Sequence, residues 1–258
     1  MRSPALRRLL LSGFVMLLSA CAATAVPPPR VQHLPLRVGV SPDTAPYTFL
    51  QGQDYAGIEI DFAHRLAQAL SRPLQIVEVP WDEQIPRLLA GRTDVIMSGM
   101  SITAARAARV AFSQPYLTTS LQAVVRKGDV DRWPTTDALL RSSPRIGVKA
   151  GTTGEALVRQ RRPDENIVVY RRSRDAIWEL RNYRIDVYVT DTPVIEAAVL
   201  KHPSDLASYP REVGRQSIAW AFRPEDTDLR SAADEVLARW RADGTVRAVL
   251  GTWPSTAD

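Results

Sequence analysis

From residue 36 onward, short apolar runs alternate with longer segments in which apolar residues recur every three or four positions. The runs have the length of buried strands, and the periodic segments have the spacing of one face of an α-helix. The pattern predicts strands at 36–40, 74–79, 94–97, 145–148, 167–170 and 186–189, and helices at 58–70, 81–90, 155–161 and 174–181. Such alternation is typical of an α/β protein with mostly parallel sheets.

The order strand, helix, strand, helix, strand occurs twice, first over 36–97 and again over 145–189. Two such units predict two similar lobes, each a mostly parallel sheet flanked by helices. The carboxyl ends of parallel strands gather at one edge of a sheet, where the following loops can meet a ligand. We therefore expect a ligand cleft between the lobes.

The chain begins with the features of an export signal. Three arginines in the first eight residues precede a nearly uninterrupted apolar run at 9–18, which is short for a membrane span. Leu18-Ser19-Ala20-Cys21 has the form of a bacterial lipobox, whose cysteine is lipidated after cleavage. The alternative is an ordinary cleaved signal in which Cys21 has no special role. The signal is thus assigned to 1–21, and the Ala- and Pro-rich segment 22–35 is predicted to be an extended tether.

Composition and charge narrow the function class. The formal net charge is +5, three arginines belong to the leader, and acidic and basic residues are interspersed along the rest. This argues against a nucleic-acid partner, which favours a clustered basic face. Cys21 is the only cysteine, so the predicted body contains no internal disulfide. The sequence contains no cluster of metal ligands, no nucleophile–base pair and no phosphate-binding glycine loop, so we expect neither a metal nor a cofactor.

Two predicted helix starts are suited to binding an anion. Thr103 is placed to cap a helix that carries Arg106 in its first turn, where a guanidinium can hold a carboxylate through two hydrogen bonds. Thr152-Thr153-Gly154-Glu155 has the form of a capping box, and a helix N-terminus offers amide groups to an anion. Considered alone, Arg106 would more commonly be a solvated helix arginine.

Asp191 ends the last predicted strand and precedes Thr192-Pro193. At that edge of the second lobe, its carboxylate can pair with a cationic group of a ligand. The alternative is that Asp191 only caps the helix that Pro193 opens. The residues themselves leave both interpretations open.

A series of short segments runs in a fixed order along the body. Its members are Leu36-Arg37-Val38-Gly39-Val40, Ala45-Pro46-Tyr47, Gly57-Ile58-Glu59-Ile60-Asp61, Trp81-Asp82, Gly91-Arg92-Thr93-Asp94, Ser98-Gly99-Met100-Ser101-Ile102-Thr103 with Arg106, Phe112-Ser113-Gln114-Pro115-Tyr116, Gly151-Thr152-Thr153-Gly154, Asp186, Asp191, Asp243-Gly244-Thr245 and Trp253. In this order the segments resemble the bacterial extracellular solute-binding proteins of family 3, the amino-acid receptors of ABC importers. The resemblance covers essentially the whole body and implies the two-lobed type II periplasmic-binding-protein fold.

The resemblance implies that one amino acid is held at both of its charged ends. Arg106, with the loops at Ser101 and Thr153, corresponds to the family's site for the α-carboxylate. Asp191 corresponds to the acid that binds the α-amino group, and Ser98-Gly99 would add carbonyl or hydroxyl acceptors.

The resemblance also implies aromatic contacts with the ligand. Trp81 occupies the position where a ring often stacks on the ligand's side chain, the alternative being an ordinary core tryptophan. Tyr47 is a second aromatic candidate. Receptors for basic amino acids often carry an acid and an aromatic ring at the positions of Ser41 and Thr44, so this chain departs from their pattern, although Asp43 lies nearby.

The lobes are expected to be discontinuous in sequence, with 36–120 plus 218–258 forming lobe 1 and 121–217 forming lobe 2. The chain is expected to cross near 117–125 and to return near 216–222, and two adjacent connections can act together as hinges. The segment 236–250 is predicted to be a helical tail on lobe 1.

These observations predict a lipid-anchored extracytoplasmic binding protein that captures an amino acid or a related small carboxylate. The expected partners are the permease of an ABC importer and, through lipidated Cys21, a membrane, and the protein itself is expected to be a monomer and not an enzyme. It is expected in the periplasm or cell envelope. Ala22 is not the aspartate that commonly retains lipoproteins in the inner membrane, so the outer membrane is favoured in a two-membrane cell.

Two alternative functions remain open on this fold. Cyclohexadienyl or arogenate dehydratases share it and retain much of the carboxylate-binding pattern, and such catalysis needs a general acid, for which Glu212 and Lys149 are the candidates. The other alternative is an accessory sensor module of a signalling or cell-wall system, which would require a separate partner.

Overall fold

The computed structural model of the chain describes residues 34–142, 145–162 and 166–253. Cys21 and the predicted signal and tether up to residue 33 lie outside the described residues. Within the described ranges, no helix has the length and apolar content that a membrane span requires.

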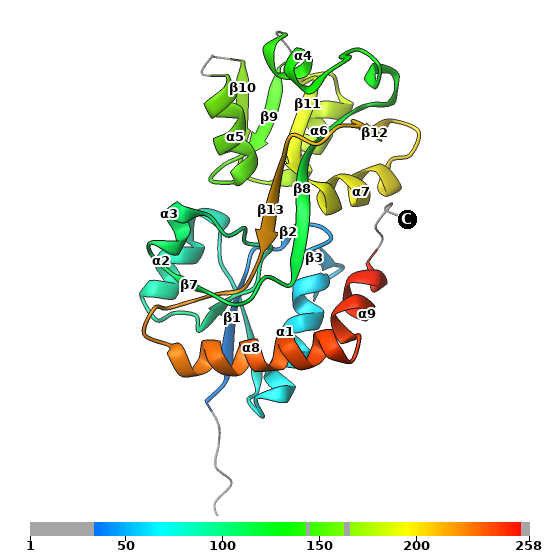
Figure 1. Ribbon diagram of the computed structural model, residues 1–258. Coiled ribbons are helices and arrows are strands. Elements are labelled where there is room, and N and C mark those ends of the chain that lie inside the picture. The colour runs from blue at the N-terminus through cyan, green and yellow to red at the C-terminus, as the bar shows by residue number, and fades with distance from the viewer. Residues whose placement is uncertain (1–33, 143–144, 163–165, 254–258) are drawn as a thin grey trace, which may run out of the picture. The chain divides into compact units, whose positions relative to one another are not determined.

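The first sheet has five strands in the order β5-β1-β6-β14-β7 (Figure 1). The strands are β1 (Leu36–Val40), β5 (Leu74–Glu78), β6 (Val95–Ile96), β7 (Ala111–Phe112) and β14 (Ala221–Phe222). β1 is parallel to β5 and β6, whereas β14 is antiparallel to β6 and β7. The helices that follow these strands are α1 (Ile58–Ala69), α2 (Gln84–Leu89) after the 3-10 turn η1 (Trp81–Glu83), α3 (Ala104–Ala107), α8 (Thr227–Ala242) and α9 (Thr245–Thr252).

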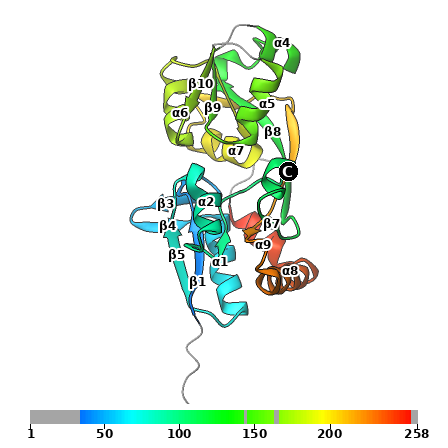
Figure 2. The same ribbon diagram turned by 90° about the vertical axis from the view of Figure 1, so that its left-hand side faces the viewer.

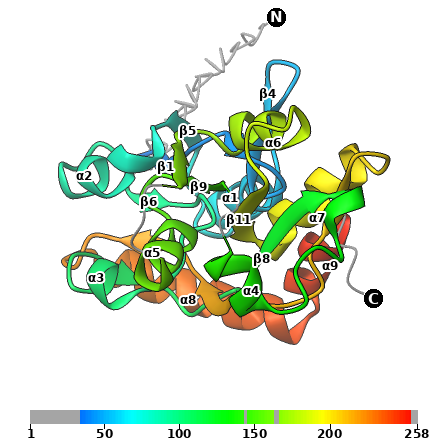
Figure 3. The same cartoon turned by 90° about the horizontal axis from the view of Figure 1, so that it is seen from above.

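The second sheet has six strands, with β10-β9-β11-β8-β12 in order and β13 also paired with β8. The strands are β8 (Leu117–Arg126), β9 (Ile146–Lys149), β10 (Ile167–Tyr170), β11 (Val187–Asp191), β12 (Leu206–Ser208) and β13 (Gly214–Ile218). The associated helices are α4 (Thr136–Arg141), α5 (Thr153–Arg161), α6 (Ser173–Arg181) and α7 (Thr192–Lys201), with the 3-10 turn η2 (Lys127–Asp129) after β8. β9, β10 and β11 form the parallel part, and α5 and α6 flank it on opposite sides (Figure 2, Figure 3).

β8 and β13 carry the chain between the two sheets and run antiparallel to each other (Figure 1). Their register pairs Gly214 with Leu121 at one end and Ile218 with Leu117 at the other. β13 ends at Ile218 and β14 of the first sheet begins at Ala221. Because β13 pairs with β8, the two crossings lie side by side. Adjacent crossings of this kind are suited to absorbing a hinge motion.

Each sheet has its own apolar core, although Val194 of α7 packs with the core of the first. In the first, the rings of Phe62, Tyr116 and Trp220 meet within about 6 Å of one another, and Trp240 of α8 stacks on Phe62. In the second, alternate residues of β8 and β11 are fully buried under α4 and α5. Each sheet therefore buries enough apolar surface to be a lobe of its own.

The structure confirms the predicted α/β, two-lobed fold and corrects its details. The predicted helix at 81–90 begins as a 3-10 turn, and Pro86 lies in the first turn of α2, where its missing N–H has no helical partner to lose. The predicted helical tail at 236–250 is helical and packs on α1 of the first lobe, but left-handed Gly244, at φ 83°, divides it into α8 and α9. A three-stranded sheet of β2 (Asp43–Thr44), β3 (Thr48–Gln51) and β4 (Asp54–Ala56) was not predicted.

Candidate ligand-binding site

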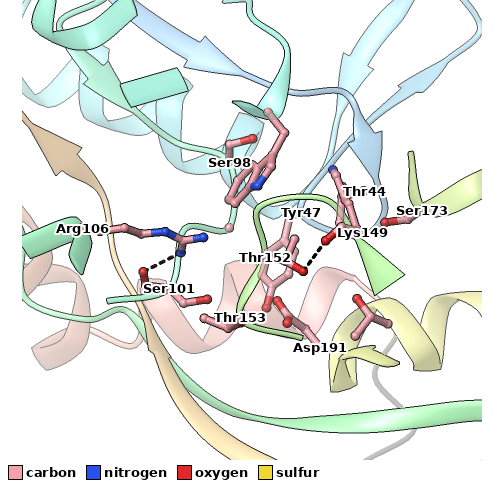
Figure 4. Close-up of a pocket in the computed structure, with 13 residues that line it drawn as sticks. Thr44, Tyr47, Ser98, Ser101, Arg106, Lys149, Thr152, Thr153, Ser173 and Asp191 are labelled. Carbon is pink, nitrogen blue, oxygen red and sulfur yellow. Dashed lines mark hydrogen bonds between the residues drawn. The ribbon is translucent and has the colours of Figure 1, made fainter. Parts of the chain in front are cut away.

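A small cavity lies where loops of the first sheet meet loops of the second (Figure 4). Its volume is about 30 Å³, which is enough to hold at least one water molecule. The residues that line it are Thr44, Tyr47, Trp81, Ser98, Gly99, Ser101, Arg106, Lys149, Thr152, Thr153, Ser173, Thr190 and Asp191. All eight residues predicted to bind a ligand are among them, and five further residues were not predicted for this role.

Arg106 enters the cavity from the short helix α3. Thr103 caps that helix by accepting a hydrogen bond from the backbone N–H of Arg106 at 3.2 Å, as the sequence predicted. The guanidinium donates to the carbonyl oxygens of Ser101 and Gly151 at 2.8 and 2.9 Å. Burial lowers the pKa of Arg106, and the group is half-buried rather than solvated. With five N–H donors, a guanidinium held by two carbonyls retains donors for an anion.

Asp191 faces the same cavity from the end of β11. It occupies the N-cap position of α7, yet its side chain forms no capping hydrogen bond to the described residues of that helix. Instead its carboxylate accepts a hydrogen bond of 2.6 Å from the amide of Gln216. Burial raises the pKa of Asp191 to about 6, and the Gln216 hydrogen bond and the charge of Arg106 oppose this rise. The side chain is thus directed into the cavity rather than used as a helix cap.

Gln216, on the crossing strand β13, connects three groups of the site. Its side-chain oxygen accepts hydrogen bonds from the hydroxyls of Ser101 at 2.8 Å and Thr153 at 2.6 Å, while its nitrogen donates to Asp191. Ser101 belongs to the first lobe's loops and Thr153 to the second's. From the sequence, Gln216 was expected only to lie in a crossing segment. Its position in a strand where the chain passes between lobes was the one available signal.

The helix α5 presents its N-terminus to the cavity. Thr152 is the N-cap and accepts from the backbone N–H of Glu155 at 3.3 Å. In a capping box, the side chain of Glu155 would accept a hydrogen bond from the backbone N–H of the N-cap residue, Thr152. Here it accepts instead from the backbone N–H of the preceding residue, Gly151, at 2.7 Å. The first amides of an α-helix have no partner within the helix. The amide of Glu155 donates to Thr152, so the amides of Thr153 and Gly154 are the ones that α5 can offer to an anion.

The loop that follows β6 is held tightly against the first lobe. The hydroxyl oxygen of Ser98 accepts from the backbone N–H of Ser41 at 2.9 Å. Gly99 is left-handed at φ 68°, and a Cβ there would lie 2.7 Å from the ring of Tyr47. Its amide donates to the buried carboxylate of Glu59 at 2.7 Å. The hydroxyl oxygen of Ser98 is therefore engaged by a backbone N–H of the protein, whereas its O–H group can still donate a hydrogen bond to a ligand.

The two predicted aromatic residues lie in different environments. Tyr47 is 1 % exposed, and its hydroxyl lies near Asp191 without forming a hydrogen bond of normal geometry to any described residue. Trp81 is half-buried and donates from Nε1 to the carbonyl of Gly151 at 3.2 Å. The guanidinium carbon of Arg106 lies 5.3 Å from its ring centroid. Trp81 is therefore a cavity residue rather than a core tryptophan.

Lys149 was considered in the sequence only as a candidate acid, and it lines the cavity. The residue is only 4 % exposed. Its ammonium nitrogen lies 2.5 Å from a carboxylate oxygen of Asp43 and 5.3 Å from the ring centroid of Trp81. Lys149 ends β9 at the sheet edge that carries the other loops of the site. Glu212, the other candidate acid, is exposed, pairs with Arg215 and does not line the cavity.

Among the described residues, no group of three or more His, Cys, Asp or Glu side chains is placed to hold a metal ion. The cavity brings together two cationic side chains, one carboxylate, several hydroxyl groups and an aromatic ring. Groups of this kind can bind the two charged ends of a zwitterion.

Comparisons with known proteins identify the family of the chain. The histidine-binding periplasmic protein of Escherichia coli is 32% identical over 237 residues, which cover 88% of each chain. The structure of the P235GK mutant of ArgBP from T. maritima is 35% identical, has a TM-score of 0.79 and covers 84% of this chain and 94% of its own. The ancestral amino acid-binding protein AncCDT-1, described as a precursor of cyclohexadienyl dehydratase, is 30% identical with the same TM-score and the same coverages. Residues 36–256 match the family model for bacterial extracellular solute-binding proteins, family 3, and the chain belongs to that family.

Proposed function

We propose that this protein is the ligand-capturing component of an ABC importer in the periplasm and that its ligand is an amino acid or a closely related small carboxylate. The observation that carries the proposal is that Arg106 and Asp191, of opposite charge, line one small cavity from the two lobes. Membership of family 3 and the relatives that are named for binding histidine and arginine support it.

The zwitterion accounts for the electrostatics of the site. A ligand α-carboxylate would accept hydrogen bonds from the Arg106 guanidinium and from the first amides of α5, both of which favour an anion. The α-ammonium group would pair with the carboxylate of Asp191. Burial raises the pKa of Asp191 to about 6, which is still below neutral pH, so the carboxylate is ionised there. The Tyr47 hydroxyl, which has no hydrogen-bond partner among the described residues, would gain one.

Binding would require the lobes to move apart, because direct contacts between their loops cross the cavity. Direct contacts between loops of the two lobes now fill the site, including the hydrogen bonds of Gly151 with Trp81 and Arg106. A motion about β8 and β13 would separate them. A ligand then favours the closed state only through its greater affinity for that state, which requires contacts with both lobes.

Attachment to a membrane through lipidated Cys21 is part of the proposal. Acyl chains contribute about 0.8 kcal/mol for each buried methylene, and several chains together give stable attachment. The variant Cys21→Ser should move the protein from the membrane fraction to the soluble fraction of the cell envelope. Recovery of mature protein with an unmodified Cys21 would contradict the anchor, and fractionation would test the expected outer-membrane location.

The ligand site is tested by calorimetry with the set of proteinogenic amino acids. Arg106→Ala and Asp191→Ala each leave one charge of the ligand buried without a partner, which typically costs about 2–5 kcal/mol. The dissociation constant should therefore rise by roughly 30-fold or more, since about 1.4 kcal/mol corresponds to a factor of ten.

Arg141 and Asp137 provide the matched controls. They form an ion pair of 3.7 Å on α4, their side chains are 79% and 67% exposed, and neither lines the cavity. Their replacement by alanine should leave the affinity unchanged. If the Arg106 and Asp191 variants are folded and bind as the natural protein does, the proposed site is wrong. Turnover of prephenate or arogenate would instead identify a dehydratase.

A further inference from the structure

Gln216 contacts three residues of the cavity at once, although it is not among the residues that line it. Its side-chain oxygen accepts hydrogen bonds from the hydroxyls of Ser101 at 2.8 Å and Thr153 at 2.6 Å, and its nitrogen donates to Asp191 at 2.6 Å. These three partners lie together along the lower edge of the cavity in Figure 4. One buried amide on the crossing strand β13 therefore holds three cavity side chains.

The chemistry of its partners determines which way the amide points. An ionised carboxylate only accepts hydrogen bonds, so the NH₂ group of Gln216 must face Asp191 and its oxygen must face the two hydroxyls. The two lone pairs of that oxygen are matched by the two hydroxyl protons. Because Ser101 and Thr153 donate these protons to the protein, their hydroxyl oxygens present only lone pairs to the cavity. They can accept a hydrogen bond from a ligand but cannot donate one.

The same amide stabilises the charge of Asp191. Burial raises the pKa of Asp191 to about 6, and the hydrogen bond from Gln216 opposes this rise most strongly. Hydrogen bonds to an ionised group are short and roughly twice as strong as those between neutral groups. This bond is made by Oδ1, so Oδ2 can face the ligand. Other titratable groups that interact with this carboxylate are Arg106 from α3, Lys149 from β9, and the hydroxyls of Tyr47, Tyr116 and Tyr188.

The full set of hydrogen bonds exists only while the lobes are closed. Ser101 belongs to the loop after β6 in the first lobe, whereas Thr153 begins α5 in the second. β13 is connected to both lobes, since it pairs with β8 and the Ser217 carbonyl accepts from the N–H of Ile102 at 2.8 Å. Two donors from different lobes can share one oxygen atom only when the lobes are together. A motion about the crossing strands would therefore break the set.

We propose that Gln216 is the positioning residue of the site for the ligand's ammonium group. As the lobes close, it orients the Asp191 carboxylate and turns the lone pairs of the Ser101 and Thr153 hydroxyls toward the cavity. An ammonium group has three N–H donors and no acceptor, which matches this set of acceptors. The role rests on the proposed function, because it takes the ligand to be an amino acid whose ammonium group pairs with Asp191.

The test is a pH titration of affinity for Gln216→Met, whose side chain has a similar length but neither an N–H donor nor a carbonyl. The probe is whichever proteinogenic amino acid binds the natural protein most tightly in calorimetry. At about pH 8, where Asp191 is ionised, the dissociation constant should rise roughly tenfold or more, as expected for the loss of a hydrogen bond to a charged group.

The pH dependence distinguishes positioning from support of the fold. In the natural protein, affinity should fall below about pH 6, where Asp191 gains a proton. In Gln216→Met this fall should begin about one pH unit higher, which is the equivalent of a tenfold change in the ionisation equilibrium. A residue that only supports the fold would lower the affinity without moving this pH.

Gln216→Asn is the second variant, because it keeps an amide on β13 but is shorter by one methylene. It cannot reach Asp191 and both hydroxyls at once, so the affinity and the pH profile should change in the same direction. Gln122→Met is the matched control. Gln122 lies on the other crossing strand, β8, and accepts from the hydroxyls of Thr192 at 3.2 Å and Ser208 at 3.5 Å, which do not line the cavity. Its affinity and pH profile should equal those of the natural protein.

The outcomes separate this role from the proposed function. Thermal denaturation verifies that each variant is folded. If a folded Gln216→Met or Gln216→Asn variant keeps the pH dependence of the natural protein, or if Gln122→Met changes it equally, the role of Gln216 is refuted while the amino-acid site stands. If none of the proteinogenic amino acids binds the natural protein, the proposed function fails, and this role fails with it.

Discussion

Replacing Glu59 by glutamine should change how the stability of the empty protein depends on pH. Glu59 lies on α1, is fully buried, and accepts hydrogen bonds from the Gly99 amide at 2.7 Å, the Tyr116 hydroxyl at 2.8 Å and the Trp220 indole at 3.0 Å. Burial raises its pKa from 4.5 to about 7, although the three hydrogen bonds oppose the rise. Glutamine has nearly the same shape and does not ionise.

The sign of the effect follows from the raised pKa. The folded protein binds the proton of Glu59 more tightly than the unfolded chain does, so this residue's contribution is fully present below pH 4.5 and is lost as the pH rises through about 7. A shift of this size corresponds to about 3 kcal/mol of the free energy of unfolding. The Glu59→Gln variant lacks this contribution to the pH dependence. Its free energy of unfolding is also lowered at every pH by about 1–3 kcal/mol, because the glutamine NH₂ group must face one of the three groups that donate hydrogen bonds to Glu59.

Urea denaturation of the ligand-free proteins between pH 4.5 and pH 8 measures the difference. From pH 4.5 to pH 8, the free energy of unfolding of the natural protein should fall by about 3 kcal/mol relative to that of Glu59→Gln. Glu225→Gln reports the effect of removing a surface glutamate, since the Glu225 side chain is 70% exposed. Parallel pH profiles for the natural protein and Glu59→Gln would refute the reasoning.

Two further predictions concern the cavity. Because an ionised Asp191 is required to pair with an ammonium group and its pKa is about 6, ligand affinity should be constant above pH 7 and fall by up to about tenfold per unit below pH 6. The same titration of Asp191→Asn should show no such fall, and a flat natural profile would contradict the pairing. Gly99→Ala brings a Cβ within 2.7 Å of the Tyr47 ring, whereas Gly52→Ala has the same φ of 68° and no atom within 4 Å. Thermal unfolding should show Gly99→Ala to be less stable than Gly52→Ala by about 1–3 kcal/mol, and equal stabilities would exclude the clash.

Local patterns predicted most of the regular structure because each element of this fold follows its own period. The strand at 36–40 buries Leu36, Val38 and Val40, and the helix at 58–70 carries a continuous buried face. Pairings made by two or three residues, such as β2 with β3, have too few positions for a period to appear. The separation of α8 from α9 depends on the backbone conformation of Gly244, which the apolar spacing does not report.

The residues predicted to bind the ligand were found because they stand at the ends of predicted strands or at helix starts, or because the family resemblance assigns them. Lys149 and Gln216 were not assigned to the ligand site, and each omission has a physical reason. Lys149 is the last residue of a strand and was considered only as a candidate general acid, since its partner Asp43 is 106 residues away in the sequence. Gln216 is a neutral residue in a crossing strand, and its three hydrogen bonds join segments that are far apart in the sequence.

The place of β14 in the first sheet determines the order in which the lobes can form. β14 lies between β6 and β7, but its residues 221–222 follow every strand of the second sheet along the chain. All strands of the second sheet come from the single stretch 117–218, so that lobe can be completed by segments already joined over short distances. To pair with β6 and β7, β14 must close a loop that contains the whole second lobe. The entropic cost of closing this loop is larger while that lobe is unfolded than after it has become compact. During synthesis or export the middle of the chain should therefore become resistant to proteolysis first, and the lobe containing the N-terminal strand should follow only when the C-terminal segment arrives.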